Sequence, residues 1–235
     1  MLVVEDVHTY YGESYVLHGV SMRVPTGELT AVMGRNGVGK TTLIRSITSL
    51  TPPSRGHIYL DGNEITGLPP HQIAKRGIAL VPQGRRIFRS LTVAEHLDKI
   101  PVSSSRDQPW SVDRILDIFP RLRERWRQRA GHLSGGEQSM LAIARALRLG
   151  PRCLLMDEPM EGLAPIYVQA VAEVIQQLRQ EGGLSILLVI PDLAMALQLA
   201  DQICVMGTGE IVFSGLPKEL ESRPDIQARY IGVGR

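Results

Sequence analysis

The chain has only two cysteines, Cys153 and Cys204, among its 235 residues. Both lie inside short apolar runs that are typical of buried strands. So small a number excludes a disulfide-rich scaffold. We expect reduced core cysteines in a cytoplasmic protein, and a disulfide or metal pair is the alternative.

Long hydrophobic runs are also missing. The longest apolar run, Leu184 to Ile190, is far shorter than the about 20 residues that a membrane-spanning helix needs. Near the N-terminus, Glu5 and Asp6 follow the apolar Leu2-Val3-Val4 directly, so no secretion signal is expected.

An excess of charge is absent as well. The formal net charge is +2 and charged residues make up 21% of the chain, which does not indicate a nucleic-acid partner. A local basic stretch, Arg121 to Arg129 around Trp126, is interpreted as a solvated face, with an acidic partner or a membrane surface as the alternative.

What the sequence does contain is an alternation of strand and helix patterns. Expected strands are Leu2–Val7, Val20–Val24, Leu29–Met33, His57–Leu60, Ile78–Val81, Cys153–Met156, Ser185–Ile190, Ile203–Met206 and Ile211–Phe213. The runs starting at Cys153, Ser185 and Ile203 are continuously apolar, as in parallel strands buried on both faces. The clearest helix is Ile166–Glu181. This alternation predicts an α/β fold around a mainly parallel sheet.

The segment from about Leu91 to Ala130 has no strand pattern. We expect a loop at Pro101–Ser105, followed by a charged helical run. We interpret it as a helical subdomain inserted into the α/β core.

A glycine-rich motif follows the expected strand Leu29–Met33 and opens an expected helix, Thr41–Leu50. Its sequence fits G-x-x-x-x-G-K-[ST], in which backbone N–H groups converge on phosphate oxygens. Lys40 can reach the β- and γ-phosphates, and the Thr41 hydroxyl can ligate Mg²⁺. The predicted nucleotide-binding residues here are Gly34, Arg35, Asn36, Gly37, Val38, Gly39, Lys40, Thr41 and Thr42.

Two adjacent acids, Asp157 and Glu158, end a strand of buried type. Successive strand residues point in opposite directions, so these two side chains serve different roles. We expect Asp157 to hold Mg²⁺ and Glu158 to polarise the attacking water.

A second anion-binding element is predicted at Leu133-Ser134-Gly135-Gly136-Glu137-Gln138, where a helix begins at about Glu137. This segment resembles the signature of ABC-type ATPases, and the resemblance extends over nearly the whole chain. It implies that ATP lies between two cassettes, each capped by the partner's segment Ser134, Gly135, Gly136 and Glu137. It also implies that Tyr11 stacks on adenine, and that Gln83 contacts Mg²⁺ and senses the γ-phosphate.

The resemblance implies a fold as well. We expect a single ABC ATPase domain over residues 1–235, with a P-loop NTPase core and an N-terminal antiparallel β subdomain at about 1–83 and 150–235. The helical subdomain with the signature is expected at about 84–149. The cofactors are ATP and Mg²⁺, and Glu158, Lys40 and Gln83 are the expected catalytic residues.

Finer patterns, such as Pro82–Phe88 and Glu161–Pro165, resemble the second ATPase of branched-chain amino-acid importers. Urea and short-chain amide importers share them. Expected partners are a second ATPase subunit, identical or different, two permeases and an external binding protein, with the chain on the inner face of the membrane. A non-transport or regulatory ABC ATPase and an exporter are the competing interpretations.

One position departs from the family pattern. Most ABC ATPases place a γ-phosphate-contacting histidine after the strand Ser185–Ile190, but this chain has Pro191 there. Proline offers neither a side-chain donor nor an N–H. One hypothesis is a site that binds ATP normally and hydrolyses it slowly. The other is that this branch does not use the position.

Overall fold

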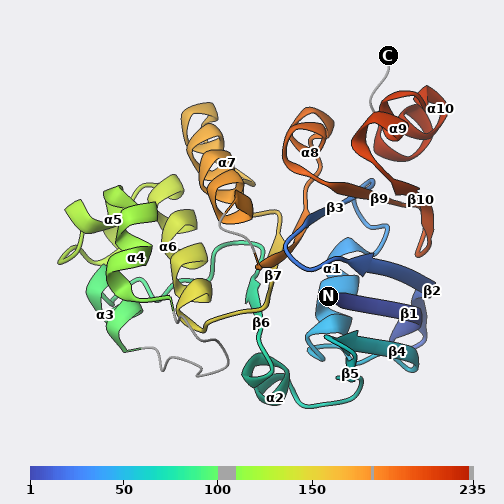
Figure 1. The fold of residues 1–235 in the computed structure, drawn as a ribbon, viewed down its shortest axis with the longest axis horizontal. Helices are drawn as coiled ribbons and strands as arrows, with labels where there is room; N and C mark the ends of the chain where they lie inside the picture. Colours follow the sequence, from blue (N-terminus) through green and yellow to red (C-terminus); the bar gives the residue numbers. More distant parts are fainter. Residues whose placement is uncertain (100–109, 181–182, 233–235) are drawn as a thin grey trace.

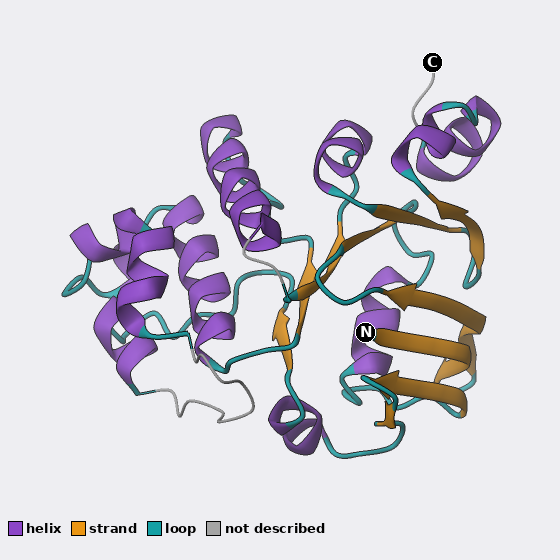
Figure 2. Cartoon of the chain, in the orientation of Figure 1, coloured by secondary structure: helices purple, strands orange, loops and turns teal. Residues whose placement is uncertain are grey.

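The computed structural model describes residues 1–99, 110–180 and 183–232. Figure 1 shows a central twisted sheet between two lobes. One is a helical lobe that runs from α3 (Val93–Asp98) to α6 (Gly135–Arg148), and the other contains α1 (Lys40–Ile47) and a second sheet. The expected loop Pro101–Ser105 lies outside the described residues. Figure 2 shows the helices of the helical lobe on one side and the antiparallel strands on the other.

The larger sheet has six strands in the order β10-β9-β3-β8-β7-β6. They are β3 (Leu29–Met33), β6 (Ile78–Val81), β7 (Cys153–Asp157), β8 (Ser185–Val189), β9 (Gln202–Met206) and β10 (Ile211–Gly215). All adjacent pairs are parallel except β10 with β9. Every residue of β3, β7 and β8 is buried. The continuously apolar runs in the sequence arise because both faces of these strands are covered.

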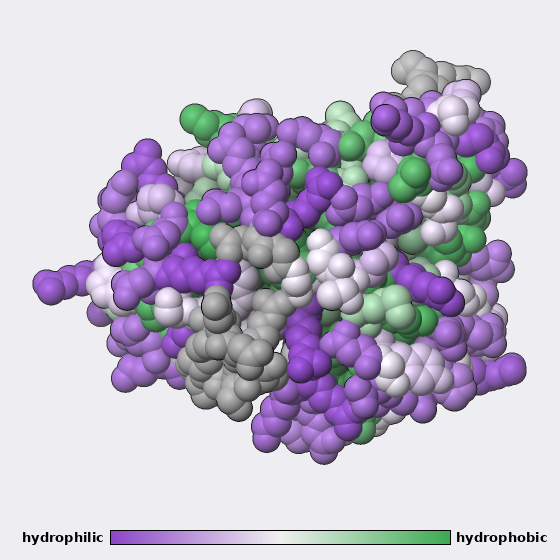
Figure 3. Space-filling view, viewed as in Figure 1, coloured by the Kyte–Doolittle hydropathy of each residue, from purple (hydrophilic) through white to green (hydrophobic). Residues whose placement is uncertain are grey.

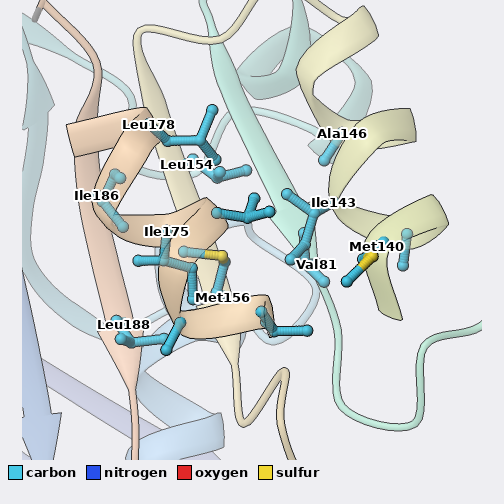
Figure 4. Packing of buried hydrophobic residues seen from close by; sticks show 14 of the residues in the cluster. Val81, Met140, Ile143, Ala146, Leu154, Met156, Ile175, Leu178, Ile186 and Leu188 are labelled. Carbon is cyan, nitrogen blue, oxygen red and sulfur yellow. The ribbon is translucent and has the colours of Figure 1, made fainter. Parts of the chain in front are cut away.

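The two faces of this sheet belong to two hydrophobic cores. Along β7, Leu154 and Met156 point into one core, and Cys153 and Leu155 into the other. In Figure 4 the first face packs against side chains of α6 (Gly135–Arg148) and α7 (Pro165–Gln180). The second face packs with α1 (Lys40–Ile47) and the antiparallel sheet. Both cysteines lie in this second core, buried and free, as predicted.

The antiparallel sheet has the order β2-β1-β4-β5. Its strands are β1 (Leu2–Tyr11), β2 (Ser14–Val24), β4 (Arg55–Leu60) and β5 (Asn63–Glu64). The first two strands are longer than predicted. The tyrosines, histidines and threonine near the hairpin turn continue the strand pairing, although most of them are not buried. Asp61 and Gly62 both have positive φ angles and join Leu60 to its partner Asn63, as a two-residue hairpin turn requires.

The helical lobe contains no strand among its described residues between 84 and 149. Its helices are α3 (Val93–Asp98), α4 (Val112–Ile118), α5 (Pro120–Glu124), a 3₁₀ turn (Ala130–His132) and α6. Outside the lobe lie α2 (Pro70–Lys75), α8 (Leu193–Leu199), α9 (Pro217–Glu221), α10 (Pro224–Ile226) and a π turn (Gln227–Ile231). The predicted α/β class with an antiparallel subdomain and a helical insertion is confirmed.

Some predicted helix limits were wrong. The first helix spans Lys40–Ile47 and not Thr41–Leu50, because Ser49 has a φ of 57° that a helix cannot contain. The helix expected at Ile166–Glu181 begins one residue earlier, and Glu181 lies outside the described residues.

The surface that Figure 3 shows is mainly hydrophilic, with small separate apolar patches. The five arginines of the basic stretch are exposed. Three of them pair with carboxylates, Arg121 with Glu124, Arg123 with Asp117 and Arg125 with Glu137. These pairs favour the solvated-face interpretation. In the part of the chain that the structure describes, no helix combines the length and apolarity needed to cross a membrane.

Candidate nucleotide-binding site

The loop Gly34–Gly39 joins the buried strand β3 to helix α1. Gly34, Gly37 and Gly39 have φ angles of 144°, 83° and 112°. A Cβ atom on Gly34 would lie 2.5 Å from the carbonyl oxygen of Met206, and one on Gly39 would lie 2.9 Å from Leu17. Glycine is therefore required at both positions. The loop backbone and the N-terminus of α1 together form a site suited to an anion.

Lys40 places its charge directly over this loop. Its ammonium donates hydrogen bonds to the carbonyl oxygens of Gly34 at 2.8 Å and Arg35 at 3.0 Å. The residue is only 5% exposed, and its Nζ lies 3.8 Å from Oε1 of Glu158. A cation held in this way can bind phosphate oxygens without first losing side-chain freedom.

Asp157, at the end of β7, has a carboxylate oxygen that lacks a donor. The residue is 2% exposed, and Oδ1 has no hydrogen-bond partner among the described residues. Burial raises the pKa of this carboxyl group, while a hydrogen bond from Thr41 and the charge of Lys40 oppose the rise. A buried carboxylate beside a hydroxyl group is a suitable pair of oxygen ligands for a hard divalent cation.

Glu158 follows with a φ of 48°, an uncommon conformation for a residue other than glycine. Its N–H donates to the carbonyl oxygen of Val189 at 3.1 Å, which anchors it to the neighbouring strand β8. Burial raises the pKa of its carboxyl group. The positive charge of Lys40 opposes this rise, and the negative charges of Glu161 and Asp157 increase it. A carboxylate with a raised pKa is a better proton acceptor.

One cavity of about 250 Å³ has Lys40, Thr41 and Glu158 in its lining, but not Asp157 or Gly34. It is lined by Val16, Asn36, Gly37, Gly39, Lys40, Thr41, Thr42, Gln83, Glu158 and Glu161. Gln83 Nε2 donates to Glu161 Oε2 at 2.9 Å and lies 3.5 Å from Glu158 Oε2. Sequence analysis did not assign a role to Val16 or Glu161. The close spacing of Glu161 to Glu158 was the available signal, but the direction of its side chain depends on the intervening turn.

The predicted signature residues lie elsewhere. Ser134 caps α6: its Oγ accepts from the N–H of Glu137 at 3.2 Å, and Glu137 Oε2 accepts from the N–H of Ser134 at 2.7 Å. A Cβ atom on Gly136 would lie 2.3 Å from the ring of Tyr167 on α7, so only glycine fits there. None of Ser134, Gly135, Gly136 and Glu137 lines the cavity that contains Lys40.

Three other predicted residues do not line this cavity. Tyr11, 43% exposed, accepts a hydrogen bond from Thr51 at 3.4 Å and does not line the cavity. The guanidinium of Arg35 donates to the carbonyl oxygen of Ala228 at 3.3 Å. The side chain of Val38 packs against the second hydrophobic core. Val38 can therefore contribute to an anion site only through its backbone, and the backbone N–H of Arg35 already donates to the carbonyl oxygen of Tyr230 at 3.1 Å.

A buried histidine holds the segment that follows Gln83. His96 is 2% exposed; its Nε2 accepts from the N–H of Phe88 at 3.0 Å, and its Nδ1 lies 2.8 Å from the carbonyl oxygen of Thr92. Only the neutral ring with its proton on Nδ1 can make both bonds. Burial lowers the pKa of His96, and the charge of Arg145 lowers it further. The hydrogen bond to Thr92 and the charge of Glu95 partly oppose this lowering.

We therefore expect acid to destabilise this region through His96. The pKa of His96 is lower in the folded chain than in the unfolded chain, where it is about 6.5. Its contribution to the free energy of unfolding is therefore complete above this pH and is lost as the pH falls below it. His96→Asn keeps a donor for Thr92 but does not titrate. Denaturation midpoints at pH 7.5 and 5.5 should show a smaller acid-induced loss in this variant than in the unmodified chain. Equal losses would contradict the prediction.

The comparisons with known proteins agree with this geometry. Residues 17–161 match the family described as ABC transporter. The chain is 43% identical to the high-affinity branched-chain amino acid transport ATP-binding protein BraG of Pseudomonas aeruginosa, over 99% of this chain and 100% of the relative. It is 36% identical to a probable branched-chain amino acid transport ATP-binding protein LivF of Archaeoglobus fulgidus, with 99% of both chains covered.

Solved structures show the same similarity. A nucleotide-free ATP-binding cassette from an ABC transporter superposes with a TM-score of 0.86 at 28% identity, over 100% of this chain and 99% of the other. A dimeric ATP-binding cassette in a post-hydrolysis state, bound to ADP and Pi, gives 0.78 at 26% identity, over 92% of this chain and 99% of the other. This chain belongs to the ABC transporter family and is an ATP-binding, ATP-hydrolysing subunit of that family.

Proposed function

We propose that this chain hydrolyses Mg-ATP to power the import of branched-chain amino acids through a membrane permease. The observation that supports this most strongly is the 43% identity to BraG over nearly the full length of both chains. LivF, also named for branched-chain amino-acid transport, is the second relative of this kind.

Several residues in and beside the cavity have a role in this proposal. Lys40 and the loop N–H groups bind the β- and γ-phosphates. Thr41, Asp157 and Gln83 provide oxygen atoms for Mg²⁺, which neutralises the charge of the phosphates when it is bound. Glu158 accepts a hydrogen bond from the attacking water and orients it toward the γ-phosphate. Tyr11 stacks on adenine once the nucleotide fills the site.

A second ATPase chain, identical or different, completes the site. The donors of Ser134, Gly135 and Gly136 at the start of α6 do not reach the cavity of their own chain. A head-to-tail pair would bring each of these segments against the partner's phosphates, where the helix N-terminus stabilises negative charge. Hydrolysis then removes the γ-phosphate that both chains bind, and the pair opens.

The permease subunits would dock on the helical lobe near the segment that follows Gln83. Since Gln83 lines the cavity and begins this segment, nucleotide state can change its position and so move the permease. This arrangement places the chain on the inner face of the membrane, and an external binding protein delivers the substrate on the other side.

Export is the second candidate, supported by a specific relative. The lipopolysaccharide export ATP-binding protein LptB of Acidithiobacillus ferridurans is 32% identical over 99% of this chain. The identity is lower than that to BraG, so import is favoured. Urea and short-chain amides are the alternative cargoes for an importer.

Uptake by intact cells tests the proposal. Deletion of the gene should abolish high-affinity uptake of labelled leucine, isoleucine and valine, and leave uptake of urea and acetamide unchanged. A plasmid carrying the unmodified chain should restore uptake, and one carrying Glu158→Gln should not. Loss of urea or acetamide uptake alone, or unchanged leucine uptake, would reject branched-chain amino acids as the cargo.

A further inference from the structure

Glu161 lies in the turn between β7 and α7, three residues after Glu158. Its carboxylate oxygen Oε2 accepts a hydrogen bond from Gln83 Nε2 at 2.9 Å. Its backbone is fixed on both sides: its N–H donates to the carbonyl oxygen of Glu158 at 3.1 Å, and its carbonyl oxygen accepts from Arg85 at 3.4 Å. The side chain therefore extends from a turn that is connected directly to the catalytic strand end.

The chemistry of this contact distinguishes the two ends of the Gln83 amide. An ionised carboxylate only accepts hydrogen bonds, whereas the amide has a donor nitrogen and an acceptor oxygen. Both carboxylates lie on the nitrogen side of the amide: Nε2 of Gln83 is 2.9 Å from Oε2 of Glu161 and 3.5 Å from Oε2 of Glu158. A rotation of the amide by 180° would place its oxygen against these carboxylates, so this orientation is disfavoured.

The geometry points to Glu161 as a positioning residue that keeps Oε1 of Gln83 available for Mg²⁺. This inference rests on the proposed role of Gln83 as a metal ligand. Mg²⁺ binds oxygen and not amide nitrogen. Without Glu161 the amide would populate both orientations, and only part of the molecules would present an oxygen to the metal.

The test measures metal dependence separately from nucleotide affinity. Purified full-length chain is titrated with Mg²⁺ in the presence of a fluorescent, non-hydrolysable ATP analogue, and the analogue alone is titrated in EDTA. Glu161→Gln retains the size of the side chain but can donate to Oε1 of Gln83 and so stabilise the wrong orientation. We expect it to raise the half-saturating Mg²⁺ concentration by about 3- to 10-fold, since an exposed charge-assisted bond has a moderate effect.

A merely structural role would not produce this pattern. Affinity in EDTA should change less than twofold, because the phosphates are bound by Lys40 and the loop. The chain offers a matched control in Glu173 on α7, which accepts from Gln169 Nε2 at 3.3 Å in an exposed carboxylate–amide pair away from the cavity. Glu173→Gln should leave both titrations unchanged.

Three outcomes would overturn the inference. An unchanged Mg²⁺ requirement in Glu161→Gln means that Glu161 does not orient the amide. An equal loss of affinity in EDTA means that the residue acts on the nucleotide or on folding. A lower Mg²⁺ requirement means that Glu161 withholds Gln83 from the metal.

Gln83→Ala separates this inference from the proposed function on which it rests. If it leaves the Mg²⁺ requirement unchanged, the metal role of Gln83 itself is wrong. If Gln83→Ala raises the requirement and Glu161→Gln does not, only the positioning role of Glu161 fails. If both raise it, the double variant should be no worse than Gln83→Ala alone.

Discussion

Replacement of Glu158 by glutamine should lower the rate of ATP hydrolysis by about 10²–10⁴-fold and leave ATP binding nearly unchanged. The amide has almost the size of the carboxylate, but it cannot accept a proton from water at neutral pH. The carboxylate is placed for this task by its position directly after β7, by Lys40 at 3.8 Å and by Gln83 at 3.5 Å. The effect is therefore expected in kcat, with little change in the KM for ATP.

The measurement is phosphate release by the purified chain, together with the affinity for a fluorescent ATP analogue. Glu173→Gln removes an exposed carboxylate on α7 and should retain full activity. A Glu158→Gln variant that hydrolyses ATP within threefold of the unmodified chain would show that another group activates the water. Loss of nucleotide binding in this variant would instead show that Glu158 is needed to position Lys40.

Much of this cavity could be predicted because its residues are fixed by local sequence. The glycines of the phosphate loop are required by the loop's own conformation and by contacts such as that of Gly34 with Met206. Lys40 and Thr41 follow the loop directly at the start of α1. Asp157 and Glu158 end a strand whose apolar run is visible in the sequence. In each case a few consecutive residues specify both the backbone and the chemistry.

Glu161 could not be predicted in this way because its contact depends on a turn. Glu158 and Gly162 have φ angles of 48° and 65°, and these bring the side chain of Glu161 toward Gln83, a residue 78 positions away in the chain. Tyr11 shows the same limit, since its contacts are with Arg45, in the last turn of α1, and with Thr51, which lies beyond the end of that helix. Short elements such as β5 and α2 were also missed, because a few exposed residues give no periodic pattern.

Pro191 stands at the position where the resemblance to ABC ATPases implies a histidine that contacts the γ-phosphate. It lies two residues after the end of β8, at the edge where β3 leads into the phosphate loop and β7 into Glu158. The N–H of the intervening Ile190 donates to the carbonyl oxygen of Val32 on β3 at 3.2 Å. Pro191 and Glu158 line a common cavity of about 230 Å³ with Met195. The next residue, Asp192, is occupied in capping α8, since its Oδ1 accepts from the N–H of Met195 at 2.8 Å. Neither residue can therefore replace the missing donor.

Pro191→His should consequently increase kcat, by up to about 10²-fold, because one hydrogen-bond donor to a developing charge commonly contributes about 10²–10³ in rate. Part of this gain is lost if the imidazole is not held by neighbours, so a smaller increase still supports the slow-site hypothesis. The measurement is ATP hydrolysis by the purified chain, with Pro191→Ala as the matched control that removes the ring without adding a donor. An equal increase in both variants would assign the effect to the backbone, and unchanged kcat in Pro191→His would mean that hydrolysis here does not use this position.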